Sequence, residues 1–68
     1  MNPDALNMSI RKFLKNVGVH SQREIEAAVA KALEEGRIKP NASFPVKMRL
    51  TAGDVSLDVT FDDRINLE

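Results

Sequence analysis

The spacing of apolar residues changes near Phe44, and this change limits the folds open to the chain. Before Phe44, apolar residues recur every three or four positions, which is typical of amphipathic helices. After it they alternate with polar residues, as in strands that bury one face. The sequence therefore predicts an α+β fold in which two N-terminal helices pack on one face of a C-terminal antiparallel β-hairpin, in the order α-α-β-β.

The clearest of these elements is a helix ending at Gly36. Ser21 and Glu24 have the spacing of a capping box, in which each side chain satisfies the other's backbone N–H. Gly36 can end the helix because it adopts the left-handed conformation without a Cβ penalty. The apolar stripe between them consists of Ile25, Ala28, Val29, Ala32 and Leu33. Leu33 is expected to face the core.

An earlier helix is predicted to begin at Asn2-Pro3-Asp4, which offers a cap, a proline in the first turn and an acid near the positive end of the dipole. Gly18 is expected to end it, and the short connection to Ser21 makes the two helices neighbours. The apolar stripe of this helix is Leu6, Ile10, Phe13, Leu14 and Val17.

The hairpin register follows from the rule that apolar residues oppose apolar residues. Pairing Leu50 with Val55 and Phe44 with Phe61 satisfies it and places Lys47 opposite Asp58. A two-residue loop, 52–53, and a four-residue loop, 51–54, both fit. Pro45, which has no N–H, favours the longer loop because it then lies with its nitrogen toward the outer edge.

The residues after Phe61 carry weaker signals. Asp62-Asp63-Arg64 is predicted to form a turn or to begin a tail, and residues 64–67 are a candidate short third strand. Leu67-Glu68 is either native or the remnant of a cloning site. A chain of 68 residues is expected to form one small domain over 1–68.

Composition restricts the chemistry of the chain. It has no cysteine, one histidine and a formal net charge of zero. Disulfides and thiolate sites are therefore excluded, and attraction of the whole molecule to nucleic acid or to a membrane is not expected. His20 has no partners at catalytic or metal-binding spacing and is expected to pack against Ile25. We expect no catalytic residues, no metal, no cofactor and a cytoplasmic protein without a signal peptide.

One helix face has the composition of a weak binding site. Met8, Arg11, Lys12 and Lys15 share the face opposite the apolar stripe of the first predicted helix. A methionine among three cations suits an acidic partner or phosphate groups. The competing interpretation is a solvated surface with one stray apolar residue.

The predicted topology also allows a second function. A helix, a glycine turn, a helix and a hairpin have the order of a winged helix-turn-helix, which binds DNA. Such a protein would use Arg11, Lys12 and Lys15, with Lys47 and Arg49 as further candidates. Acidic residues on the outward face of the second predicted helix argue against this function, because they would repel phosphate.

The run from Asn7 to Val29, NMSIRKFLKNVGVHSQREIEAAV, resembles the opening of a family of short bacterial proteins of unknown function. Members of that family continue with a similar alternating hairpin, so the likeness extends over most of the chain. The resemblance implies a bacterial, cytoplasmic, stand-alone domain and supplies no activity and no site residues.

Together these patterns predict a protein of unknown function that acts as a small non-enzymatic protein–protein interaction module. Its partner would be another protein or a second copy of itself. The alternative is a nucleic-acid-binding domain of winged-helix-like topology.

Overall fold

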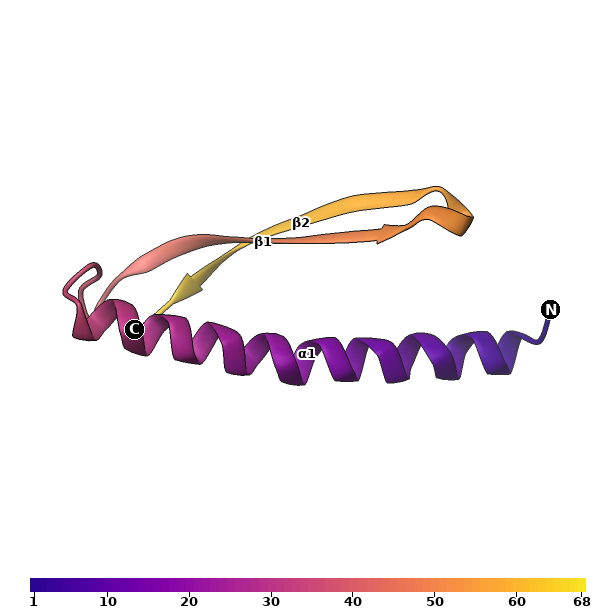
Figure 1. Cartoon of the computed structure of the whole chain (residues 1–68), viewed down its shortest axis with the longest axis horizontal. Coiled ribbons are helices and arrows are strands. Elements are labelled where there is room, and N and C mark those ends of the chain that lie inside the picture. The colour runs from indigo at the N-terminus through magenta and orange to yellow at the C-terminus, as the bar shows by residue number, and fades with distance from the viewer. The chain divides into compact units, whose positions relative to one another are not determined.

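The computed structural model describes residues 1–68 and contains one helix followed by one hairpin (Figure 1). The elements are α1 (Pro3–Glu34), β1 (Ser43–Ala52), the 3₁₀ turn η1 (Gly53–Val55) and β2 (Leu57–Asn66). The predicted α+β class and the order of helix before hairpin are confirmed. The chain forms two compact units, Met1–Arg37 and Ile38–Glu68. The packing of helix on hairpin stays a prediction.

The prediction of two helices is wrong. A single helix of 32 residues runs through the segment from Gly18 to Ser21 that was expected to be a connection. Gly18 does not adopt a positive φ, so it is an interior helical residue and not a stop. Ser21 likewise lies within the helix and does not cap a new one.

Backbone hydrogen bonding explains why the helix continues. A glycine inside a helix costs about 1 kcal/mol relative to alanine. A break would instead leave up to four N–H and four C=O groups without helical partners. One half-buried helix face also passes through the junction, because Val17, Ser21 and Ile25 follow one another at intervals of four, and all three are half-buried.

The two ends of α1 form as the sequence predicts. The Asn2 side chain accepts hydrogen bonds from the backbone N–H groups of Asp4 at 3.0 Å and of Ala5 at 3.2 Å. At the other end, Gly36 has a φ of 71°. Its N–H donates to the carbonyl of Leu33, and the Arg37 N–H donates to that of Ala32. This pair of bonds is a Schellman motif, which satisfies carbonyls at the helix end.

The hairpin register differs from the prediction by four residues. Phe44 pairs with Ile65 and Leu50 with Val59, where Phe61 and Val55 were expected. Lys47 therefore lies opposite Asp62 and not Asp58. A shift by an even number of residues leaves every side chain on its predicted face, so the apolar pattern satisfies both registers.

The turn lies two residues later than predicted. Gly53–Val55 form η1, and Ser56, with a φ of 53°, completes the reversal in the left-handed region. The Ser56 N–H donates to the carbonyl of Gly53 at 3.1 Å. The expected loops at 52–53 and 51–54 are both wrong, although the connection still has four residues, 53–56. Val55 leaves the strand and is largely exposed.

The later turn lengthens β2, which runs to Asn66. Asp62-Asp63-Arg64 lies inside this strand and is neither a turn nor a tail, and residues 64–66 complete β2 and form no third strand. The Leu67 N–H donates to the carbonyl of Ala42 at 3.0 Å, which continues the pairing beyond the strand ends. The longer register gains these backbone bonds, which explains why it is preferred.

The chain buries very little side-chain surface. Ala32, at 8% exposure, is its only buried residue. Leu33, expected in the core, is exposed. The hairpin side chains Phe44, Val46, Leu50 and Ile65 are half-buried. A two-stranded hairpin and a single helix each leave an apolar face in water unless something covers it.

Candidate functional site

The predicted binding face on α1 is open and unpaired. Met8, Arg11, Lys12 and Lys15 are all exposed, Met8 at 65%. None of the three cations forms an ion pair, since the ion pairs of the chain involve other residues. The face is therefore available to a partner, as it is to water.

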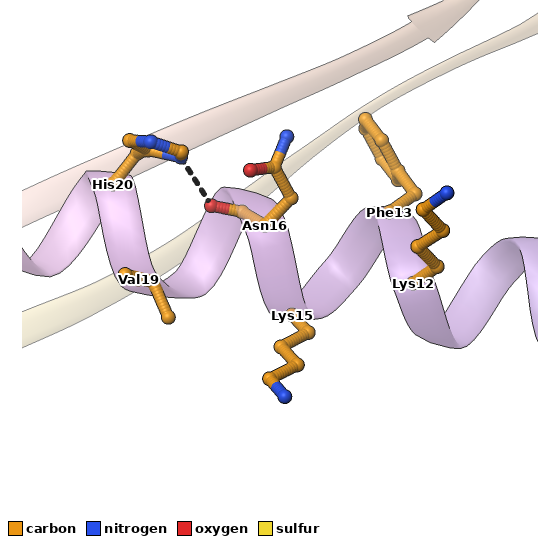
Figure 2. A pocket seen from close by; sticks show the side chains of 6 residues that line it. All are labelled: Lys12, Phe13, Lys15, Asn16, Val19 and His20. Carbon is orange, nitrogen blue, oxygen red and sulfur yellow. Dashed lines mark hydrogen bonds between the residues drawn. The ribbon is translucent and has the colours of Figure 1, made fainter.

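A shallow hollow lies beside this face. It is lined by Lys12, Phe13, Lys15, Asn16, Val19 and His20, all from α1. Figure 2 shows Lys15 and Val19 on the other side of the helix from Phe13, Asn16 and His20. The polar groups diverge, whereas a small-molecule site needs polar groups that converge on one ligand. Lys12 and Lys15 both line the hollow, whereas Met8 and Arg11 do not.

His20 is held by its own helix. Its Nδ1 donates a hydrogen bond to the backbone carbonyl of Asn16 at 2.8 Å, because a carbonyl oxygen can only accept (Figure 2). His20 was expected to precede the start of a helix and to pack there against Ile25. No helix starts at this point, since His20 lies within α1. The hydrogen bond of the ring is thus made to the backbone of its own helix and not to an acid or hydroxyl side chain.

Two cations of the hairpin, Lys47 and Arg49, lie beside carboxylates of the opposite strand. Arg49 donates two hydrogen bonds to the Asp58 carboxylate, at 3.0 and 2.8 Å. These bonds raise the pKa of Arg49 and lower the pKa of Asp58. Lys47 lies 4.0 Å from Asp62. Because a carboxylate lies beside each, these two cations attract phosphate less than free ones would.

The most unusual surface of the chain is apolar. Leu6, Ile10, Phe13 and Leu14 lie on one side of α1, here called the N-terminal stripe, and each is between 47% and 55% exposed. Sequence reasoning placed these residues in a core and so did not consider them as a binding surface. The signal that could have found them is the small size of the chain, which offers little to cover a long helix.

Two further observations concern metal ions and membranes. No group of three or more His, Asp or Glu side chains is placed to hold a metal ion. No helix is long and apolar enough to cross a membrane.

The full length of the chain, residues 1–68, matches the model of a family described as "Family of unknown function (DUF6494)". The chain belongs to this family. The resemblance inferred from residues 7–29 is therefore confirmed and extends to the whole sequence. No curated protein and no solved structure matches the chain. The DUF6494 assignment carries no function.

Proposed function

We propose that this DUF6494 protein is a non-enzymatic protein–protein interaction module that binds its partner through the N-terminal stripe. The observation that carries this proposal is the half exposure of four large apolar side chains on one helix face. Monomeric proteins rarely expose contiguous apolar patches of this kind unless the patch is a binding site. An amphipathic helix that presents such a face is a common recognition element.

The charge pattern around the stripe supports the same function. The cations of this half of the helix, Arg11, Lys12 and Lys15, lie on other faces of α1. Protein interfaces are depleted of charge at the centre and polar at the rim. The stripe would thus form an apolar interface centre free of charge, and the cations on the opposite face would stay in water.

Two observations weigh against the alternative functions. The continuous helix removes the helix-turn-helix on which the winged-helix interpretation rested. An enzyme needs a nucleophile, an acid–base pair or a metal, and the only histidine bonds to its own helix.

Site-specific photocrosslinking in the source cell tests the proposal. A photoreactive phenylalanine analogue at Phe13 should form covalent adducts with a polypeptide, because that side chain would lie in the interface. The matched control places the same analogue at Glu26, on the opposite side of α1. Adducts that are equal at both positions, or that contain nucleic acid and no polypeptide, would contradict the proposal.

A further inference from the structure

We propose that the outer edge of β2 binds an extended segment of another protein that carries cationic side chains on one face and apolar side chains on the other. This edge is separate from the N-terminal stripe, so the inference goes beyond the proposed function and does not rest on it. It is carried by three observations on the hairpin: the unpaired backbone of its edges, the closed positions on β1, and the carboxylates along β2.

Both strands of the hairpin have an outer edge with no strand beside it (Figure 1). The helix α1 cannot supply one, because its backbone groups bond within the helix. Bonded and non-bonded pairs alternate along an antiparallel ladder, and the bond from Leu67 to Ala42 places the bonded pairs at the even-numbered residues of β1. The N–H and C=O groups of β2 that point outward therefore belong to Asp58, Thr60, Asp62, Arg64 and Asn66.

The outer edge of β1 is closed at the end of the hairpin away from the turn. Pro45 lies at an outward position and has no N–H to donate to an added strand. The Ser43 carbonyl, at the next outward position, accepts a hydrogen bond from the Arg64 guanidinium at 3.1 Å. On β2, the Arg64 N–H donates to the Asp63 carboxylate at 2.8 Å. A carboxylate can release an N–H to another acceptor, whereas proline has none to give, so β2 is the edge that can add a strand.

The charges along the edges select the partner. Lys47 and Arg49 lie at outward positions of β1, and cations on an edge strand oppose the addition of a further strand. Asp58 and Asp62 lie at outward positions of β2, on one face because they are four residues apart. The only ion pair of Asp62 is the 4.0 Å contact with Lys47. A carboxylate has about four acceptor sites, so Asp58 also keeps free sites beside the two bonds from Arg49.

These positions define the sequence of the partner segment. Antiparallel pairing is slightly more stable than parallel pairing, and it places side chains directly opposite each other about 4.5–5.5 Å apart. The residues opposite Asp58 and Asp62 are therefore lysine or arginine. The residues opposite Val59 and Phe61 are apolar, since these two side chains lie on the other face. The segment is thus a cation, an apolar residue, a polar residue, an apolar residue and a second cation.

A second copy of the chain does not suit this edge. A two-fold contact between β2 strands centred on Thr60 would place Asp58 of each copy opposite Asp62 of the other. Like charges directly opposite each other destabilise a strand pair. A contact of β2 with β1 of another copy would use the edge that Pro45 closes. The occupant is therefore a different protein.

Fluorescence polarisation of a labelled peptide titrated with the full chain tests this inference. The probe has Lys-Val-Thr-Val-Lys at its centre, and the matched control has Glu-Val-Thr-Val-Glu. We expect saturable binding of the lysine peptide only, weakened by added salt because salt screens exposed charges. N-methylation of both lysines removes the N–H groups that face β2 and should abolish binding, whereas N-methylation of both valines, whose N–H groups face away, should not.

A proline variant of the protein locates the binding edge. Thr60→Pro removes an outward N–H of β2 without removing a bond to β1. It should raise the dissociation constant of the lysine peptide about tenfold, the factor for one hydrogen bond of about 1.4 kcal/mol. Thr51→Pro is the matched control, because it makes the same change at an outward position of β1, and it should leave the affinity unchanged.

A charge variant keeps the test decisive if Thr60→Pro unfolds the hairpin. Asp62→Lys should abolish binding of the lysine peptide, whereas Asp54→Lys, the same change in the turn η1, should not. A wild type that does not bind the peptide, equal losses with the two N-methylated peptides, or equal affinities of the two aspartate variants would overturn the proposal. A wild type that instead associates with itself, and no longer does so as Thr60→Pro, would overturn it in favour of a second copy.

Discussion

Replacing Gly18 by alanine tests whether α1 is one helix. Gly18 lies inside α1 without a positive φ, and a Cβ added there would meet no atom within 4 Å. Alanine is therefore accommodated without strain and gains the intrinsic helix preference of about 0.8–1.0 kcal/mol over glycine. In a chain of this size, such a gain corresponds to a rise of roughly 4–8 °C in the unfolding midpoint.

Gly36→Ala is the matched comparison because it makes the same chemical change at the other end of α1. Gly36 also has open space around its Cβ position, but its φ is 71°. A left-handed alanine costs about 1–2 kcal/mol, and the lower entropy of the unfolded chain offsets only about 0.4–1 kcal/mol. Gly36→Ala should therefore lower the unfolding midpoint, whereas Gly18→Ala raises it.

Helical circular dichroism during thermal and denaturant unfolding measures both variants, at one fixed chain concentration because an association would shift the midpoint. Opposite signs for the two variants support the continuous helix. If Gly18→Ala destabilises the protein as much as Gly36→Ala, Gly18 ends a helix in solution and the single-helix structure is refuted.

Three further variants test other parts of the structure. Asn2→Ala removes the acceptor for two backbone N–H groups and should cost about 0.5–2 kcal/mol in denaturant unfolding, with Asn2→Ser restoring most of it. Leu33→Ala should cost less than about 2 kcal/mol, below the usual range for a buried leucine, because Leu33 is 38% exposed; a larger loss would place it in a core. Asp58→Asn should weaken the hairpin slightly at neutral pH and in low salt. The pKa of Asp58 is lowered on folding by its bonds to Arg49, so its contribution to stability is present above the unfolded pKa and is lost as pH falls through the folded pKa. Wild type and Asp58→Asn should thus converge in stability in acid, and a gap that persists there would contradict the ion pair.

The helix ends could be predicted from sequence because their chemistry is local. Asn2 needs only the N–H groups that follow it, and Gly36 is followed by residues that do not continue a helical pattern. Gly18 was misinterpreted because a glycine is compatible with both a stop and an interior position. The helical spacing of Val17 and Ile25, eight residues apart, was the sequence evidence that one helix face continues through this segment.

The register of the hairpin could not be predicted, for a different reason. Alternation has a period of two, so registers that differ by an even number of residues, here four, place the same side chains on the same face. The choice then depended on the turn, and a left-handed serine at Ser56 is not a strong sequence signal. The exposed face of α1 that carries Met8 and Arg11 could be predicted from helical spacing alone. The openness of the N-terminal stripe was not, because burial depends on which residues distant in sequence cover a face.

The N-terminal half of α1 is exposed at every position from Pro3 to Asn16, and this has a consequence for local unfolding. From Pro3 to Val17 the helix has 15 residues, a length at which isolated helices are only marginally stable in water. When nothing covers the N-terminal stripe, this segment should open at little cost, and its amide protons should exchange faster than those near the Schellman motif. It also contains Arg11, Lys12 and Lys15, after which trypsin cleaves. The rate of tryptic cleavage at these three residues should therefore report how much of the protein has its apolar face covered, and should fall as that face is occupied.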